Sequence, residues 1–302
     1  MTNTGNRWII SGGRVLKPAP FLLMGILNLS PESFSDAARG ISRQPRPPEN
    51  GTDGLRSFAA EGRSMAQEGA HVLDLGGEST RPGAEALSAE EEARRVLPAL
   101  AALLEEFSKD TPPERPALSV DTYKAKTARS ALESGAEIIN DISAWSFDPE
   151  LKEALLEHKP GYVLMHCQGR PDNMQAAPLY NNVLEEVYAF LDRKLEELVR
   201  AGFPEERVVI DPGICFGKKL EHNLALLKHI DRFYSLGRPV LVGISYKSFL
   251  GGLTGAALER RGGLTLAASA LLAQRGVWAH RVHDVAAVKE ALQLAHSLAG
   301  VE

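Results

Sequence analysis

The stretch RPVLVGISYKSFLGG, from Arg238 to Gly252, contains the pattern that decides the fold. An apolar run, Pro239–Ile244, ends abruptly at the polar residues SYKS, and a helix-like run follows. Continuous rather than alternating hydrophobicity is typical of a parallel strand that helices cover on both faces. The stretch therefore predicts a buried strand that carries Lys247 at its carboxyl end, immediately before a helix.

The same pattern recurs along the whole chain. Eight apolar runs are strand candidates: Phe21–Leu29, His71–Leu75, Ala117–Val120, Ile138–Ile142, Tyr162–Met165, Val208–Ile210, Pro239–Ile244 and His280–Val282. Helical patterns lie between them, most clearly at Ser88–Phe107, Leu179–Ala201, Leu220–Leu236 and Asp284–Leu298. This alternation favours a (β/α)8 TIM barrel over an open sheet. A short β-hairpin around residues 7–18 is expected to precede the first barrel strand and cover the barrel bottom.

Composition narrows the class of protein. The chain has 302 residues and 44% hydrophobic residues, enough for a sizeable core, and we expect one domain over residues 1–302. A net charge of -5 argues against nucleic acid or a membrane surface as partners. Because no run approaches a membrane span and no secretory pattern begins the sequence, a cytoplasmic location is expected. Residues 39–54, rich in proline and glycine, are expected to form a mobile loop.

The two cysteines, Cys167 and Cys215, are too few for a disulfide framework, and their spacing fits no zinc motif. Each follows an apolar run, so we expect buried thiols rather than a catalytic nucleophile. His166, His222 and His229 also lack the spacing of a protein metal cage.

Three polar residues at strand ends predict a ligand pocket. The active site of a TIM barrel lies at the carboxyl ends of its strands. Asp121, Asn140 and Asp211 come at the ends of the third, fourth and sixth predicted strands, where they can converge. Two carboxylates and an amide suit a flat heterocycle with adjacent N–H donors. The alternative is that each caps the following helix, above all Asp121, which directly precedes a helical pattern.

Two further pairs indicate anion binding. Arg281 and His283 lie two residues apart on the last strand and so point the same way, as a phosphate clamp would require. A buried ion pair of Arg281 is the alternative. Lys247 and Ser248 precede a helix whose free N–H groups would favour a carboxylate or phosphate.

Blocks of sequence at these strand ends resemble the dihydropteroate synthase family. The blocks are MGILNLSPESFSD (24–36), GGESTRPGA (76–84), SVDTYK (119–124), INDIS (139–143), MHCQGRPDNMQ (165–175), DPGICFGK (211–218), GISYKSFLG (243–251) and RVHDV (281–285). They run in the family's order over most of the chain. The resemblance implies a homodimeric TIM barrel of folate biosynthesis. It would condense 6-hydroxymethyl-7,8-dihydropterin pyrophosphate with p-aminobenzoate, giving 7,8-dihydropteroate and pyrophosphate, with Mg²⁺ as cofactor.

The resemblance also implies roles for individual residues. The catalytic residues would be Asp121, Asp211, Lys247, Arg281 and His283. The pterin pocket would contain Asp121, Asn140, Met165, Asp211, Phe216, Gly243 and Lys247. The pyrophosphate would contact Asn28, Arg281 and His283, with Asn28 also beside the Mg²⁺ ion. The p-aminobenzoate site would be formed by Thr80, Arg81, Pro82, Lys247 and Ser248.

Some positions depart from the family pattern: Glu32, Ala37, Ala38, Cys167, Cys215 and Tyr246. Cys215 replaces a frequent glycine and is compact enough to be a mild change. Tyr246 replaces the usual arginine before Lys247, which removes a permanent cation. Three other functions stay open: a pterin-binding paralogue without synthase activity, the pterin domain of a methyltransferase, and a scaffold barrel without enzymatic activity. The scaffold would have apolar strand ends, which this chain lacks.

Overall fold

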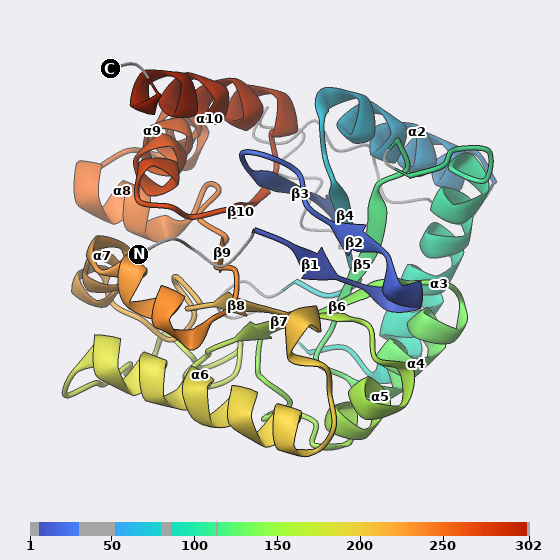
Figure 1. The fold of residues 1–302 in the computed structure, drawn as a ribbon, viewed down its shortest axis with the longest axis horizontal. Coiled ribbons are helices and arrows are strands. Elements are labelled where there is room, and N and C mark those ends of the chain that lie inside the picture. The colour runs from blue at the N-terminus through green and yellow to red at the C-terminus, as the bar shows by residue number, and fades with distance from the viewer. Residues whose placement is uncertain (1–5, 30–51, 80–85, 113, 301–302) are drawn as a thin grey trace.

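A computed structural model of the chain describes residues 6–29, 52–79, 86–112 and 114–300 (Figure 1). Eight parallel strands form the barrel: β3 (Leu22–Asn28), β4 (Val72–Gly76), β5 (Ala117–Asp121), β6 (Ile138–Asp141), β7 (Gly161–Met165), β8 (Val208–Asp211), β9 (Leu241–Val242) and β10 (Ala279–Val282). They pair in the order β8-β7-β6-β5-β4-β3-β10-β9. A parallel bridge between Ile210 and Val240 joins the two edges. The predicted TIM barrel is confirmed.

Helices surround the strands: α2 (Thr52–Glu68), α3 (Ala89–Glu106), α4 (Ala125–Glu133), α5 (Glu150–His158), α6 (Val183–Arg200), α7 (Leu220–Lys228), α8 (Ser248–Thr254), α9 (Arg261–Gln274) and α10 (Val285–Ala299). Ser88, the first residue of the predicted helical pattern Ser88–Phe107, caps α3 by accepting a hydrogen bond from the backbone N–H of Glu91. In the ranges that the structure describes, no helix is long and apolar enough to cross a bilayer.

Three predicted elements differ from the structure. α6 begins at Val183, four residues after Leu179, because Asn182 caps it. The run Leu220–Leu236 is broken after Lys228 into α7 and a 3-10 helix, Ile230–Leu236, which buries Phe233. β9 is only Leu241–Val242, in part because Pro239 has no N–H to donate to a ladder.

Alternation of side chains along the strands produces two layers inside the barrel. The lower layer is apolar and contains Leu22, Met24, Val72, Ala117, Ile138, Val163, Val209, Leu241 and Ala279. The residues two positions further along these strands face the same way, because the side-chain period of a strand is two. They include Asp74, Ser119, Asn140 and Arg281. The apolar layer therefore supports a polar layer at the carboxyl ends of the strands.

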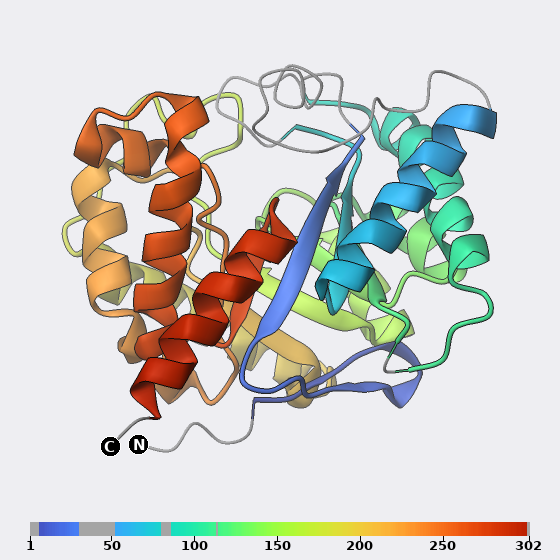
Figure 2. The same cartoon turned by 90° about the horizontal axis from the view of Figure 1, so that it is seen from above.

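A two-stranded antiparallel hairpin, β1 (Trp8–Ile9) and β2 (Val15–Leu16), closes the barrel bottom (Figure 2). Trp8, Ile10 and Leu16 pack against the lower layer. The Trp8 indole donates to the Arg207 carbonyl at 2.7 Å. A buried indole with its N–H satisfied anchors the hairpin firmly, which confirms the predicted cover.

Candidate active site

A buried network of hydrogen bonds connects four strands at the upper layer. Asp74 Oδ2 accepts from Arg281 Nε at 2.7 Å and from Asn140 Nδ2 at 2.9 Å. Asp74 Oδ1 accepts from Ser119 Oγ at 2.6 Å, and Arg281 Nη2 donates to Asp121 Oδ2 at 2.8 Å. Arg281 thus lies between two carboxylates. The buried ion pair of Arg281, left open by the sequence, is present.

Strand register brings these residues together. Gly76 pairs with Asn28 on one side and Asp121 on the other, and Asp121 pairs with Asn140. Asn28 Oδ1 lies 3.1 Å from the position that a Cβ of Gly76 would occupy. Glycine at this position leaves room for the Asn28 amide beside the two acidic strands.

Neither Asp121 nor Asn140, its partner on the next strand, caps the helix that follows it. The backbone N–H of Ala125, at the start of α4, is capped instead by Asp148 Oδ2 at 2.7 Å. Asp141 is buried outside the barrel wall, where it accepts from Tyr162 Oη at 2.8 Å and from the backbone of Trp145. Asn140 therefore belongs to the hydrogen-bond network at the strand ends, and Asp141 belongs to the scaffold.

Burial shifts the acidity of the groups in this layer. It raises the pKa of Asp121 to about 7, against the lowering effect of the Arg281 charge. Burial also raises the pKa of Asp211, with Lys247 opposing, and lowers the pKa of Lys247, with Asp211 among the opposing charges. Charges held in such a low-dielectric site interact strongly with a ligand.

Lys247 lies beside an aromatic wall. Its Nζ donates to the Ile214 carbonyl at 2.6 Å and lies 4.7 Å from the centroid of the Phe216 ring. Phe216 packs on a small apolar cluster that includes Met165. A Cβ on Gly243 would lie 3.7 Å from Lys247 Nζ. Apolar faces and a cation thus adjoin the carboxylates, an arrangement that suits a flat, polar heterocycle.

Tyr246 points away from this wall. Its ring makes an edge contact with His283, at 5.8 Å between centroids, and its Oη lies 3.1 Å from where a Cβ of Gly262 in α9 would be. His283 Nδ1 is 3.0 Å from Ser245 Oγ. The tyrosine therefore packs on a predicted pyrophosphate residue and on a helix, whereas Lys247 faces the pocket.

Ser248 begins α8, as the sequence predicts, and is exposed, with its Oγ 3.8 Å from Cys215 Sγ. Several predicted positions lie outside the described residues. They are Thr80, Arg81 and Pro82 of the predicted p-aminobenzoate site, the divergent Glu32, Ala37 and Ala38, and residues 39–51 of the predicted loop. Residues 52–54 of that loop form the start of α2.

Comparisons with known proteins agree with this architecture. Residues 24–283 match a family described as pterin binding enzyme. The chain belongs to the pterin-binding enzyme family. Its relatives include the dihydropteroate synthase of Haemophilus influenzae, 38% identical over 90% of this chain and 92% of that protein.

Solved structures of dihydropteroate synthase resemble this pterin-binding enzyme over nearly its full length. That of Xanthomonas albilineans with 4-aminobenzoic acid is 39% identical, with a TM-score of 0.84, over 99% of this chain and 100% of that chain. The same organism's enzyme in complex with 7,8-dihydropteroate is 36% identical, with a TM-score of 0.80, over 98% and 100% of the two chains.

Some groups of this pterin-binding enzyme were not assigned a role from sequence. Asp74 is fully buried and holds Arg281, Asn140 and Ser119 together. The sequence did offer one sign of this role: Asp74 lies two residues after Val72 on a predicted strand, so the two side chains face the same way, into the barrel.

Lys218 is also buried, and its Nζ lies 2.9 Å from His166 Nδ1. Burial lowers the pKa of Lys218 to about 7.

A second buried cluster forms around Glu78, two residues after the end of β4. Glu78 Oε2 accepts from Lys124 Nζ at 2.5 Å and from the backbone N–H of Leu87 at 2.9 Å, and its Oε1 accepts from Tyr123 Oη at 2.8 Å. Lys124 Nζ also lies 3.3 Å from Glu92 Oε1. Glu78 therefore connects Leu87, just before α3, with Tyr123 and Lys124, which follow β5. Sequence reasoning gave no sign of this, because it cannot show which charges become buried.

The expectations for the two cysteines need correction. Both are free and half-buried rather than fully buried. Burial raises the pKa of Cys167 to about 11, which agrees with the expectation that it is not a nucleophile. Cys215 has a φ of 70°, in the left-handed region that favours glycine. Replacement of glycine by cysteine is therefore strained by the backbone, and its small size does not make it mild.

Cys215→Gly is expected to stabilise the protein. A non-glycine residue in the left-handed region costs about 1–2 kcal/mol, and the greater entropy of an unfolded glycine takes back about 0.5–1 kcal/mol. A net gain of roughly 0.5–1 kcal/mol corresponds to a rise in Tm of about 1–4 °C, measurable by calorimetry. Cys215→Ser keeps the left-handed strain and is the control; an equal rise in Cys215→Ser would show that the thiol, not φ, is responsible.

Proposed function

We propose that this pterin-binding enzyme is a dihydropteroate synthase, a transferase of folate biosynthesis. It joins 6-hydroxymethyl-7,8-dihydropterin pyrophosphate to p-aminobenzoate and releases pyrophosphate. The observation that carries the proposal is its near full-length likeness to a dihydropteroate synthase solved with 7,8-dihydropteroate. The buried acids and the lysine beside an aromatic wall are the chemistry that such a substrate requires.

In this proposal the pterin ring lies in the upper layer of the barrel. Asp121, Asn140 and Asp211 supply two carboxylates and an amide for its N–H donors, which supports the assignment because an ionised carboxylate accepts two adjacent hydrogen bonds. Met165 and Phe216 offer an apolar face to the ring. Gly243 lies beside Lys247, at ordinary van der Waals distance from its Nζ.

Pyrophosphate binding is proposed for Arg281, His283 and Asn28. Arg281 lies on β10, His283 directly follows the end of that strand, and Asn28 faces the barrel interior on the adjacent strand β3. The ion pairs with Asp74 and Asp121 fix the guanidinium in one orientation, so little rotamer entropy is lost when an anion binds.

A Mg²⁺ ion fits these residues. The donor set offered is the Asn28 amide oxygen, and Mg²⁺ takes oxygen ligands, retains several waters and is often held by few protein ligands plus substrate phosphates. Among the described residues no group of three His, Cys, Asp or Glu side chains is arranged to hold a metal. Asn28 would hold the ion together with the pyrophosphate. When bound, Mg²⁺ supplies positive charge that neutralises the leaving group.

The proposed reaction is a dissociative substitution. The bond from the pterin methylene carbon to the pyrophosphate oxygen breaks, and the electron pair leaves with pyrophosphate, beside Arg281 and His283. The methylene cation delocalises into the dihydropterin ring, where the charges of Asp121 and Asp211 favour it. The p-aminobenzoate nitrogen then bonds to the methylene carbon and loses a proton to solvent or pyrophosphate. Positional exchange of labelled pyrophosphate oxygens without p-aminobenzoate tests this order; no exchange argues for concerted displacement.

The synthase assay decides between the two leading functions. Purified protein with both substrates and Mg²⁺ is expected to form 7,8-dihydropteroate and pyrophosphate in equal amounts. A pterin-binding paralogue would bind the pterin pyrophosphate tightly and form no product, and that result would replace the proposal. A homodimer is proposed on the resemblance, and analytical ultracentrifugation measures it. The cytoplasmic location stays a prediction from the sequence, and cell fractionation measures it.

Tyr246→Ala is expected to affect the pterin substrate rather than p-aminobenzoate. The tyrosine ring packs edge-on against His283, and such aromatic pairs are worth about 0.5–1.5 kcal/mol. We expect kcat/KM for the pterin pyrophosphate to fall roughly 2- to 12-fold, with the KM of p-aminobenzoate unchanged. Tyr246→Phe keeps the ring and is the matched control. A change confined to the KM of p-aminobenzoate would instead assign Tyr246 to the second substrate.

A further inference from the structure

The segment after β8, residues 212–218, is held by side chains that hydrogen-bond its backbone. Four consecutive carbonyl oxygens, those of residues 214–217, each accept a hydrogen bond from a different side chain. The pairs are Lys247 with Ile214 at 2.6 Å, Gln175 with Cys215 at 2.5 Å, Lys218 with Phe216 at 3.0 Å, and Tyr180 with Gly217 at 2.9 Å. The carbonyls of a loop are mostly satisfied by solvent, because loops run over the surface. Four side-chain hydrogen bonds in a row therefore restrict the conformation of this segment strongly.

The segment between β7 and α6 packs directly on this run and supplies two of the four donors. Gly213 and Gly217 have φ values of 72° and 63°, in the left-handed region. A Cβ on Gly213 would lie 1.8 Å from the carbonyl oxygen of His166, and a Cβ on Gly217 would lie 2.1 Å from that of Gln168. The two segments are thus in direct backbone contact and form one closely packed unit beside the candidate active site.

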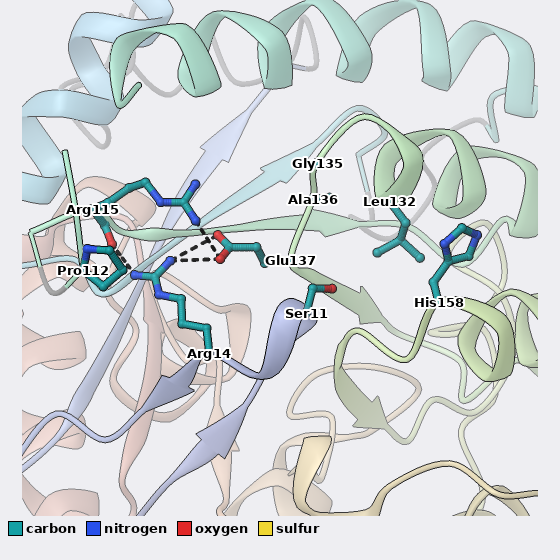
Figure 3. A pocket seen from close by; sticks show the side chains of 10 residues that line it. Ser11, Arg14, Pro112, Arg115, Leu132, Gly135, Ala136, Glu137 and His158 are labelled. Carbon is teal, nitrogen blue, oxygen red and sulfur yellow. Dashed lines mark hydrogen bonds and ion pairs between the residues drawn. The ribbon is translucent and has the colours of Figure 1, made fainter. Parts of the chain in front are cut away.

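Lys218 is a buried cation without an acidic partner. At the barrel bottom, by contrast, Arg14 pairs with Glu137 at 3.0 Å (Figure 3). Lys218 Nζ lies 2.9 Å from His166 Nδ1 and donates to the carbonyl oxygens of Phe216 and His166 at 3.0 and 3.4 Å, and it makes no ion pair with a described residue. A buried charge without a counter-ion is costly, and an apolar side chain would fill the same space at lower cost. The stability of the fold therefore does not explain a lysine at this position.

Gln175 and Lys218 hold the two peptide groups on either side of the Cα of Phe216. The carbonyl of Cys215 belongs to the peptide group before this Cα, and the carbonyl of Phe216 belongs to the one after it. Because the orientations of the two peptide groups define φ and ψ, the two hydrogen bonds fix the direction in which the Phe216 ring leaves the backbone. The ring is half-buried and its centroid lies 4.7 Å from Lys247 Nζ, beside the proposed pterin pocket.

We propose that Gln175 and Lys218 are positioning residues for the pterin substrate and act through Phe216. This inference rests on the proposed function, in which the Phe216 ring offers an apolar face to the pterin. With both flanking peptide groups held, the ring is already in place when the pterin arrives, and less conformational entropy is lost on binding. Neither Gln175 nor Lys218 has to touch the pterin for this effect.

A double-variant cycle tests the proposal. Calorimetry with 6-hydroxymethyl-7,8-dihydropterin pyrophosphate and Mg²⁺, without p-aminobenzoate, gives the Kd of the parent protein, of Gln175→Leu, Lys218→Met and Phe216→Ala, and of each of the first two combined with Phe216→Ala. Loss of the hydrogen bond in Gln175→Leu or Lys218→Met is expected to weaken pterin binding roughly 2- to 12-fold. Each combined variant is expected to bind like Phe216→Ala alone, within about twofold, because a residue that acts through the ring has no effect once the ring is absent.

Two further variants control for general damage to the protein. Lys194→Met removes a half-buried lysine of α6, whose Nζ lies 4.3 Å from the centroid of the Trp145 ring, and should leave the Kd unchanged. Gln175 is only partly buried, so Gln175→Leu keeps the proposal testable if Lys218→Met folds poorly.

The outcomes separate this inference from the proposed function. Unchanged affinity in a folded Gln175→Leu or Lys218→Met, or losses that multiply with that of Phe216→Ala, would overturn the inference while the parent protein still binds the pterin. A parent protein that binds the pterin but forms no dihydropteroate would overturn the synthase assignment alone. A parent protein that does not bind the pterin would overturn both.

Discussion

Lys247→Ala is expected to lower kcat/KM for dihydropteroate formation on the order of 10²- to 10³-fold, the loss typical when a site loses one preorganised electrostatic group. Lys247 Nζ is fixed by the Ile214 carbonyl and lies over Phe216, so its charge is aimed at the proposed pterin pocket without reorganisation. Steady-state kinetics with each substrate varied separately measure the loss.

The fold of Lys247→Ala should persist. Burial lowers the pKa of this lysine, which means that the charged side chain destabilises the native state. Replacing the lysine by alanine removes that unfavourable charge. We therefore expect a Tm equal to or above that of the parent protein. Lys109→Ala, at an exposed position outside the barrel, is the matched control. Near-normal turnover in Lys247→Ala would remove this lysine from the site.

Arg281→Met is expected to cost about 3–5 kcal/mol of folding free energy and to abolish measurable turnover. The substitution leaves Asp74 and Asp121 as adjacent buried carboxylates without their shared cation. A loss of that size is a large fraction of a typical stability of about 5–15 kcal/mol. Denaturant unfolding gives the free energy. Arg94→Met, whose side chain is 72% exposed, should change it by less than about 0.5 kcal/mol.

The loss in Arg281→Met should depend on pH. Burial already raises the pKa of Asp121 in the parent protein to about 7, and loss of the neighbouring cation raises it further. An acid whose folded pKa exceeds its unfolded value of 3.8 is destabilising when ionised, and stability falls as pH rises from 3.8 to the folded pKa. The difference between variant and parent should therefore shrink as pH falls from 8 towards about 5. Adding Asp74→Asn should restore part of the stability; if it restores none, carboxylate repulsion is not the cause.

Several features of the site followed from sequence because they depend on local periodicity. A strand has a side-chain period of two, so Ala279 and Arg281 of β10 face the same way. Because β10 ends at Val282, the shared direction of Arg281 and His283 stays a prediction. Likewise, continuous apolar runs followed by helical patterns allow few architectures, and the barrel with its hairpin is the one observed. The cap of α3 at Ser88 is equally local, because its partner is three residues away.

The sequence by itself thus determined the barrel, the end of the barrel at which polar residues gather, and the family that the motifs resemble. The tertiary structure alone decided which of those polar residues meet: Arg281 with Asp74 and Asp121, and Tyr246 with His283 rather than with the lysine beside it. It alone revealed the left-handed backbone at Cys215. The physical reason is that pairing and burial join residues far apart in the sequence, 207 positions for Arg281 and Asp74, and such contacts depend on strand register and closure, which no local pattern encodes.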